Sequence, residues 1–281
     1  MTNLNLDFSR YADRIGYRGP RDPTVDVLQQ LHRHHTLAVP FENLDVQLGV
    51  ALDTSIEAAY DKIVNRRRGG WCYEQNGLFG AVLSTLGFEV TRLAAGVMMH
   101  EKGADRFGNH LCLMVKAPGT EQRWLADVGY GGSMLHAIPL SPGEHSQPPY
   151  ALSISSLGEG WLRFCESAVD DAPFCFDFPL IEANEALLSS KCVELQTAED
   201  SSFVLSLVAQ RRTATQRLSL RGRVLRTFGV NGTHEQLLES PEQLVDTLVN
   251  TFSLQMPAVA ELWPRICERH DELFPERNDN R

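Results

Sequence analysis

The spacing of apolar residues changes near residue 88, and this change constrains the fold more than any other feature of the sequence. Before it, apolar residues recur at helical spacing, as in residues 24–34, where Val25, Leu28 and Leu31 share one face of a predicted helix. After it, apolar and polar residues alternate in short runs bounded by glycine and proline. Helices followed by a strand-rich region indicate an α+β protein.

Two further helices are predicted in the first ninety residues. The sequence Thr-Ser-Ile-Glu at residues 54–57 is a capping-box pattern, which makes Thr54 the cap of a helix that continues to Val64. Another helix follows Cys72, because apolar residues recur through residues 78–86 and Gly87 is well placed to end it.

Strands dominate the centre of the chain, and helices return at its end. The predicted strands cover residues 88–97, 110–115, 123–128, 150–155, 161–165, 203–209, 217–221 and 224–228. Residues 139–149 contain four prolines and one glycine and are predicted to form a surface loop. Ser240 and Pro241 are a cap and first-turn pair for one C-terminal helix, and Pro264 interrupts a second over residues 258–273.

Composition and charge limit the partners that we expect. The chain has 281 residues, of which 43% are hydrophobic and 22% charged, and its net charge of −10 is spread along its length. A general nucleic-acid binder needs a basic face, and the one basic run covers only residues 66–68. The sequence has neither a long uncharged apolar run nor the apolar centre of a signal peptide. We therefore expect a cytoplasmic protein that binds neither nucleic acid nor membrane.

The cysteines show no pattern of a metal site. Neither a C-x-x-C pair nor the Cys and His spacing of a zinc site is present, so we predict no metal cofactor. In a reducing compartment most of the cysteines are expected to be free thiols. They are Cys72, Cys112, Cys165, Cys175, Cys192 and Cys267.

The residues around Cys72 favour a reactive thiolate. Residues 66–77 read Arg-Arg-Arg-Gly-Gly-Trp-Cys-Tyr-Glu-Gln-Asn-Gly. The two glycines permit a tight turn, and Cys72 then falls at the start of a predicted helix. Unpaired N–H groups and the helix dipole at that position stabilise a thiolate. The alternative is that Cys72 is a small buried residue beside a structural turn.

His110 and Asp127 are predicted to pair across two strands. His110 begins one strand, and Asp127 is a carboxylate in an otherwise apolar run, where burial without a partner is unfavourable. A hairpin centred on Pro118 and Gly119 would place His110 and Asp127 directly opposite each other on one sheet face. The alternative is a purely structural His–Asp pair.

Cys72, His110 and Asp127 together supply a nucleophile, a base and a carboxylate that orients the base. An ion pair with the His110 imidazolium would keep Cys72 as a thiolate at neutral pH. Cysteine proteases, transglutaminases and acyltransferases share this logic, and the spacing alone does not choose among them.

Three separated motifs resemble those of the arylamine N-acetyltransferases. They are Val-Pro-Phe-Glu-Asn-Leu-Asp at residues 39–45, Arg-Arg-Gly-Gly-Trp-Cys-Tyr-Glu-Gln-Asn at residues 67–76 and Asp-Val-Gly-Tyr-Gly-Gly at residues 127–132. The motifs stand in the family's order, and the resemblance covers residues 11–132 well. It implies an α+β fold around a cysteine-protease-like Cys-His-Asp core. The implied domains are an N-terminal helical bundle (1–87), a central β-barrel-like domain (88–200) and a C-terminal α/β lid (201–281).

The resemblance implies a two-step transfer of an acetyl group that requires acetyl-CoA and no metal. Cys72 would accept acetyl from acetyl-CoA, coenzyme A would leave, and an arylamine, arylhydrazine or arylhydroxylamine would then take the acetyl group in a ping-pong reaction. One alternative is a macrolactam-forming amide synthase of the same family, which shares these motifs. Another is a transglutaminase-like or papain-like hydrolase, which leaves the motif at residues 39–45 unexplained. The sequence does not fix the oligomeric state, and a homodimer is compatible with it.

The same motifs imply roles for residues around the triad. Glu42 and Arg68 resemble an ion pair that holds the catalytic loop, and Tyr130 matches an aromatic residue that borders the acceptor pocket. Three glycines are implied to let the backbone approach the pyrophosphate or acyl group of coenzyme A, with a simple tight turn as the alternative. They are Gly129, Gly131 and Gly132.

Overall fold

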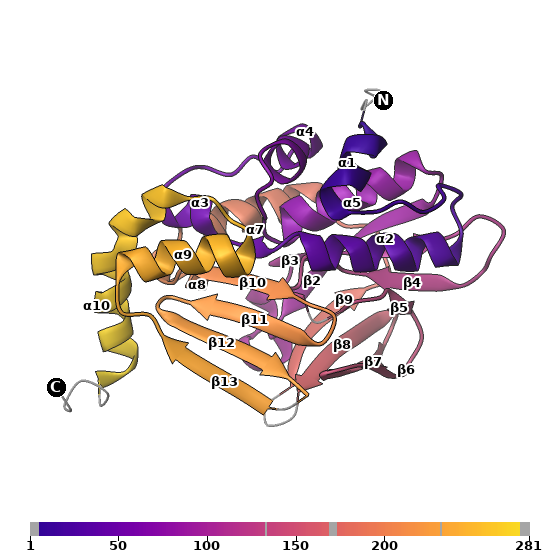
Figure 1. The fold of residues 1–281 in the computed structure, drawn as a ribbon. Coiled ribbons are helices and arrows are strands. Elements are labelled where there is room, and N and C mark those ends of the chain that lie inside the picture. The colour runs from indigo at the N-terminus through magenta and orange to yellow at the C-terminus, as the bar shows by residue number, and fades with distance from the viewer. Residues whose placement is uncertain (1–5, 133, 169–172, 231, 276–281) are drawn as a thin grey trace.

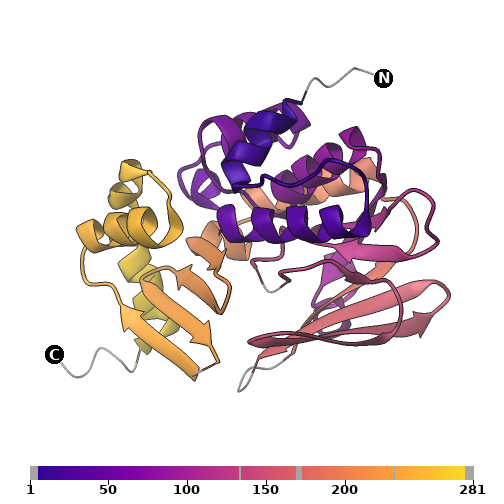
Figure 2. The same ribbon diagram turned by 45° about the vertical axis from the view of Figure 1, so that its right-hand side comes forward.

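Helices form most of the first part of the chain in this computed structural model, which describes residues 6–132, 134–168, 173–230 and 232–275. The elements are α1 (Phe8–Ile15), α2 (Val25–Ala38), β1 (Phe41–Glu42), α3 (Leu44–Gln47), α4 (Ile56–Tyr60), the π-helix η1 (Asp61–Asn65) and α5 (Cys72–Thr85). The two longest helices, α2 and α5, lie side by side above the sheets (Figures 1 and 2). This region is the predicted helical part of the fold.

The middle of the chain forms an eight-stranded, antiparallel, barrel-like sheet. Its strand order is β5-β4-β3-β2-β9-β8-β7-β6, and α5 packs against β2 and β3. The elements are β2 (Glu89–Val97), α6 (Met99–Lys102), the 3₁₀ helix η2 (Ala104–Arg106), β3 (His110–Lys116), β4 (Arg123–Ala126), β5 (Ile138–Pro139), β6 (Gly143–Gln147), β7 (Tyr150–Gly158), β8 (Trp161–Ala168) and β9 (Phe174–Pro179).

The last part of the chain builds a second, five-stranded sheet with helices around it. Its elements are α7 (Glu185–Thr197), α8 (Ser202–Leu205), β10 (Val208–Arg212), β11 (Gln216–Arg221), β12 (Val224–Gly229), β13 (Gly232–Leu237), α9 (Pro241–Phe252), the 3₁₀ helix η3 (Pro257–Leu262) and α10 (Trp263–Leu273). The strand order is β1-β10-β11-β12-β13, so a strand from the N-terminal region completes this sheet. Figure 2 shows the two sheets on opposite sides of the molecule with the N-terminal helices above both.

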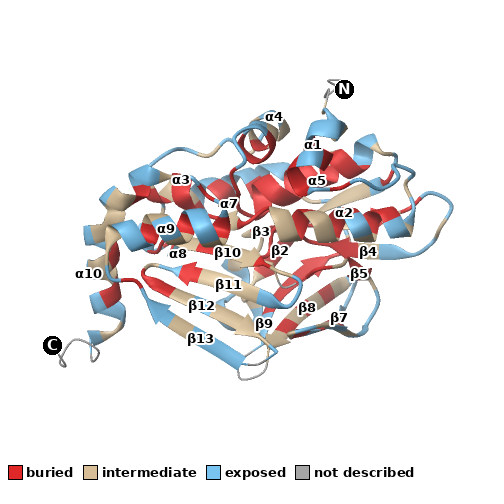
Figure 3. Ribbon diagram, in the orientation of Figure 1, coloured by how far each residue is buried: buried red, intermediate tan, exposed pale blue. Residues whose placement is uncertain are grey.

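Separate apolar clusters hold these parts together. One joins the N-terminal helices to the barrel-like sheet, a second fills the inside of that sheet, and a third lies between the five-stranded sheet and α9. A fourth contains Cys72, Leu111 and Leu188 and joins α5, β3 and α7. Figure 3 shows that α5 is buried along most of its length. Among the helices of the described residues, none is long and apolar enough to cross a membrane.

Helix ends follow the predicted signals with one shift. Ser240 caps α9, and its side chain accepts a hydrogen bond from the Gln243 N–H, as predicted. Gly87 has φ +97° and follows Leu86, the C-cap of α5, which confirms its role as a helix stop. The cap of α4 is Ser55 rather than Thr54, because α4 begins at Ile56 and the Ser55 hydroxyl accepts the Ala58 N–H (3.3 Å).

One strand prediction and one loop prediction are partly wrong. Within residues 203–209, the Ser201 hydroxyl accepts the Phe203 N–H and starts the short helix α8, so the strand begins only at Val208. Within residues 139–149, the predicted loop contains β6, an edge strand that pairs with β7. Of the prolines in this range, Pro139 lies in the edge strand β5 and the others lie outside β6. A missing N–H is tolerated at these positions.

The predicted register between β3 and β4 is wrong by two residues. Lys116 pairs with Arg123, so His110 and Asp127 are diagonal neighbours rather than directly opposite each other. Pro118 and Gly119 do form the turn, but two further residues before Arg123 lengthen the loop on one side only. Because a shift of two keeps each side chain on its original face, the two residues still meet.

Candidate active site

Cys72 is buried and is the first residue of α5. The loop before it lies against β1, because the Glu42 N–H donates to the Gly70 carbonyl (3.1 Å) and the Gly70 N–H donates to the Pro40 carbonyl (3.3 Å). A Cβ on Gly69 would clash with the Pro40 carbonyl oxygen. The two glycines therefore let the loop approach β1 and bring Cys72 to the helix N-terminus, where the dipole favours a thiolate.

His110 and Asp127 are hydrogen-bonded, with 2.7 Å between His110 Nε2 and Asp127 Oδ2. The other carboxylate oxygen accepts hydrogen bonds from Asn76 Nδ2 (2.7 Å) and from the Gly129 N–H (3.0 Å). The backbone N–H of Asp127 donates to His32 Nε2 (3.1 Å). These neighbours hold the carboxylate in place and direct one oxygen at His110.

The pKa of His110 is raised from 6.5 to about 10. Burial opposes the charged imidazolium, but the Asp127 carboxylate and the Cys72 side chain both favour it through charge and side-chain hydrogen bonding. The two attractions outweigh the burial. The His110–Asp127 pair and Cys72, which lie far apart in the sequence, are brought close together, since Gly129 donates to Asp127 and lies against the Cα of Cys72.

The glycines after Asp127 pack closely against Cys72 on one side and against β10 on the other. A Cβ on Gly129 would lie 2.7 Å from the Cα of Cys72, so a larger residue would displace the cysteine. Gly131 and Gly132 have φ +83° and +92°, a region that favours glycine. A Cβ on Gly131 would clash with the side-chain oxygen of Gln210 on β10. The turn therefore lies between Cys72 and the five-stranded sheet.

Five charged side chains form a buried network beneath the start of α5. Arg68 Nη2 donates to Glu42 Oε1 (2.8 Å) and to Asp45 Oδ1 (3.0 Å). Lys62 Nζ lies 2.7 Å from Asp45 Oδ2 and 2.8 Å from Glu74 Oε1. The second oxygen of Glu74 accepts the N-cap N–H of α5 (3.1 Å). The network thus ties β1 and η1 to the first turn of α5.

Each cation of this network is stabilised by its carboxylates. Burial lowers the pKa of Lys62 and Arg68, but the neighbouring carboxylates outweigh it and raise both. The sequence predicts only the Glu42–Arg68 pair. Asp45 and Glu74 lie inside the recognised motifs and could have been found there, whereas nothing in the pattern around Lys62 indicates its role.

Aromatic rings pack against the buried His110 imidazole. The Tyr130 ring lies 5.2 Å from His110, 4.9 Å from Phe176 and 5.4 Å from Phe174, measured between centroids, and is stacked on the last. The Tyr130 hydroxyl is buried without a hydrogen-bond partner among the described residues. Tyr130 therefore presents a polar group inside an otherwise aromatic wall next to His110.

The remaining cysteines differ from Cys72. Cys165 and Cys175 face each other on β8 and β9 and form a disulfide, while the other four cysteines are free, as most were predicted to be. Burial raises the pKa of Cys112 well above its usual value and that of Cys192 to about 12. Among the described residues, no group of three or more His, Cys, Asp and Glu side chains could hold a metal ion.

The sequence of this chain matches those of N-acetyltransferases. The profile of the N-acetyltransferase family matches residues 24–260. The arylamine N-acetyltransferase of Mycobacterium tuberculosis is 36% identical over 268 residues, which cover 92% of this chain and 93% of the relative. That of Mycolicibacterium smegmatis is 34% identical over 274 residues, which cover 94% of this chain and 98% of the relative.

Solved structures of arylamine N-acetyltransferases have the same fold as this chain. The arylamine N-acetyltransferase of Mycobacterium marinum superposes with a TM-score of 0.84 at 36% identity, over 95% of this chain and 99% of that one. Its structure in complex with CoA gives a TM-score of 0.84 at 35% identity, with the same coverage. The chain belongs to the arylamine N-acetyltransferase family, and it is therefore an acyltransferase with the α+β architecture of that family.

Proposed function

We propose that this chain transfers an acetyl group from acetyl-CoA to an arylamine, arylhydrazine or arylhydroxylamine through an acetyl-Cys72 intermediate. The observation that carries the proposal is the hydrogen-bonded His110–Asp127 pair beside Cys72: Gly129, whose N–H donates to Asp127, lies against the Cα of Cys72 at the start of α5. The names of the relatives and the CoA complex of the M. marinum protein support the two substrate classes.

In the first step, the Cys72 thiolate attacks the carbonyl carbon of the thioester. The bond between that carbon and the coenzyme A sulfur breaks, and the departing thiolate takes the proton of the His110 imidazolium. Asp127 keeps the ring oriented and stabilises its charged form. Free coenzyme A leaves, and acetyl-Cys72 remains beside a neutral His110.

In the second step, the acceptor nitrogen attacks the acetyl carbonyl of acetyl-Cys72. The carbon–sulfur bond breaks, the product amide leaves, and His110 takes the proton that the nitrogen loses. This restores the thiolate–imidazolium pair. An arylamine suits the step because its nitrogen is unprotonated at neutral pH.

We assign the aromatic wall to the acceptor. Tyr130, Phe174 and Phe176 lie beside His110 and offer ring faces and edges to an aromatic substrate. The unpartnered hydroxyl of Tyr130 can hydrogen-bond a polar substituent of the acceptor. Glu42 and Arg68 then act at a distance, as the ion pair that holds the loop before Cys72.

We also propose that the acyl end of the donor lies beside the glycine turn after Asp127. Gly129 is in contact with Cys72, so a thioester that reaches the sulfur passes this turn. Small residues here let the backbone lie close to Cys72, where the acyl group would be transferred. The residues concerned are Gly129, Gly131 and Gly132.

Family membership argues against the papain-like hydrolase. The macrolactam-forming synthase shares the cysteine chemistry and differs in its acceptor.

An exchange experiment tests the covalent mechanism: acetyl-CoA is mixed with isotopically labelled coenzyme A and no amine. We expect label to enter acetyl-CoA, because the first step is complete without an acceptor. Label exchange that requires the amine would contradict the acetyl-enzyme.

A further inference from the structure

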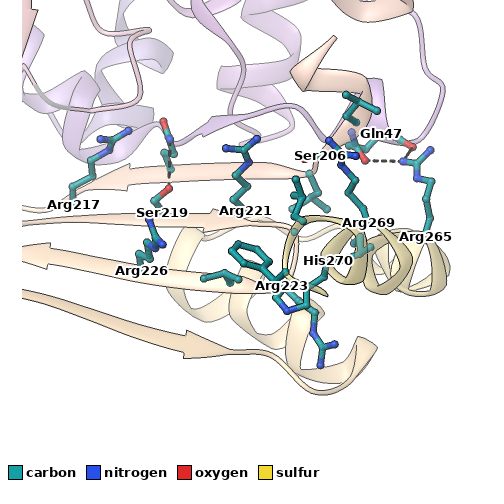
Figure 4. Close-up of a pocket in the computed structure, with 18 of the residues that line it drawn as sticks. Gln47, Ser206, Arg217, Ser219, Arg221, Arg223, Arg226, Arg265, Arg269 and His270 are labelled. Carbon is teal, nitrogen blue, oxygen red and sulfur yellow. Dashed lines mark hydrogen bonds between the residues drawn. The ribbon is translucent and has the colours of Figure 1, made fainter. Parts of the chain in front are cut away.

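A cavity of about 510 Å³ lies between the five-stranded sheet and α10 (Figure 4). Six arginines line this arginine cavity, and no carboxylate is among the described residues that line it. The six are Arg217, Arg221, Arg223, Arg226, Arg265 and Arg269. In a chain with a net charge of −10, such a local excess of cations indicates a binding site for an anion.

Strand alternation places the sheet arginines on one face. Arg217 and Arg221 project from β11 to the same side, with Ser219 between them (Figure 4). Arg226 on β12 is the register partner of Ser219. Leu220 faces the other way and packs into the core beneath α9. The apolar face of the sheet therefore supplies stability, and the arginine face is left for a ligand.

Half of these arginines have no carboxylate partner within the described part of the chain: Arg221, Arg223 and Arg265. The Arg221 side chain is exposed and makes no hydrogen bond or ion pair with any described residue. Arg226 pairs with Glu235 (2.8 Å), but the exposed fractions of the two side chains are 47% and 31%. Both guanidinium groups are therefore accessible to a ligand.

One end of the cavity lies next to the glycine turn after Asp127. Gln210 and Arg217 both line it, and both lie against the glycine turn: a Cβ on Gly131 would clash with the Gln210 oxygen and lie 3.4 Å from Arg217 Nη2. Gly129, two residues earlier, contacts Cys72. Arg221 lies four residues beyond Arg217, which corresponds to about 13 Å along the strand.

We propose that the arginine cavity binds the phosphate groups of the coenzyme A thioester, an inference that rests on the proposed use of acetyl-CoA. Coenzyme A carries its thioester at one end of the pantetheine arm and its diphosphate and 3′-phosphate at the other. Guanidinium groups bind phosphate oxygens through paired, charge-assisted hydrogen bonds. With the acetyl group at Cys72, the arm passes Gly131 and the phosphates reach Arg221 and Arg226.

Pre-steady-state acetylation of Cys72 tests this placement with three donors: acetyl-CoA, acetyl-dephospho-CoA and acetylpantetheine. For acetyl-CoA, we expect the second-order rate constant to fall about 10-fold in Arg221→Gln and further in the double variant with Arg226→Gln, from the loss of hydrogen bonds to charged groups. The rate at saturating acetyl-CoA should change little, because neither arginine touches the reacting atoms. The loss should shrink as phosphates are removed from the donor.

Arg123→Gln is the matched control, since Arg123 is an exposed strand arginine of the barrel-like sheet outside the cavity. It should leave the donor preference unchanged. Equal losses for acetyl-CoA and acetylpantetheine in Arg221→Gln, or no loss for either, would overturn the inference. If no thioester acetylates Cys72 in the unmodified protein, it is the proposed function that fails.

Calorimetry with adenosine 3′,5′-bisphosphate tests the cavity without Cys72 chemistry. We expect binding to the unmodified protein and about 10-fold weaker binding to Arg221→Gln. Inorganic phosphate alone should bind far more weakly than the bisphosphate. Absence of bisphosphate binding, or inorganic phosphate that binds equally well, would show that the cavity is no nucleotide site.

Discussion

Two groups of charged residues in this molecule are arranged in opposite ways. Beneath the start of α5, Lys62 and Arg68 are buried, and each contacts two carboxylates within 3.0 Å. In the arginine cavity, cations converge on a space that no carboxylate lines among the described residues. Buried charges are stable only with partners, whereas accessible charges can await a ligand. Paired charges therefore support the loop before Cys72, whereas the cavity arginines include some without a carboxylate partner among the described residues, such as Arg221, which we propose for the donor.

We expect the largest effect from a change to the His110–Asp127 pair, a further pair of buried charged residues close to Cys72. Asp127→Asn keeps the shape of the side chain but favours the wrong imidazole tautomer and no longer stabilises the imidazolium. Acetyl transfer should fall by about 10⁴-fold in stopped-flow assays. Asp200→Asn, at an exposed position, is the control. A rate for Asp127→Asn within 10-fold of the unmodified enzyme would contradict this role.

The same pair predicts a pH dependence. The pKa of His110 is about 10 in the folded protein and 6.5 for an unperturbed histidine, as in the unfolded chain. Its positive charge therefore stabilises the fold fully below about pH 6.5. That stabilisation is lost as the pH rises through about 10. Histidine NMR titration should show His110 protonated at neutral pH, and a lower pKa in Asp127→Asn. A His110 resonance that titrates near 6.5 would be the contrary result.

The buried network should respond through stability. Lys62→Met leaves Asp45 and Glu74 buried without that cation, so the free energy of unfolding should fall by about 3–5 kcal/mol in urea titrations. Arg66→Met is the control, because the Arg66–Asp61 pair is exposed and its loss should cost about 0–1 kcal/mol. Equal losses in the two variants would mean that burial does not distinguish these pairs.

The arginine cavity should give the smallest change in stability. Arg221 is exposed and unpaired among the described residues, so Arg221→Gln should alter the free energy of unfolding by less than about 0.5 kcal/mol. Urea titrations of Arg221→Gln and Lys62→Met under the same conditions compare the two free energies of unfolding. A loss as large as that of Lys62→Met would mean that Arg221 supports the fold, and the contrast between the two regions would disappear.

The first half of the molecule is largely predictable because its signals are local. A Gly-Gly turn before a helix, a helix stop at Gly87 and a carboxylate in an apolar strand each have one favourable structural solution. Cys72, His110 and Asp127 follow from such signals. The register between β3 and β4 does not, since it depends on two extra residues on one side of the turn.

The arginine cavity is harder to predict because it forms from distant segments. Arginines alternate with leucines in Arg217, Leu218, Ser219, Leu220 and Arg221, which is a signal for one charged face of a strand. Nothing in the sequence shows that α10 brings two more arginines to that face. The short helix α8 is missed for a different reason, because one serine cap outweighs an apolar run that resembles a strand.

The central claim is that Cys72 carries the acetyl group, and mass spectrometry tests it most directly. The protein is incubated with acetyl-CoA alone, its intact mass is measured, and the modified peptide is mapped. We expect one acetyl group on Cys72, which is discharged when aniline or a hydrazine is added. An unmodified Cys72 that still reacts rapidly with iodoacetamide would contradict the account, because the nucleophile would be active but acetyl-CoA would not be its donor.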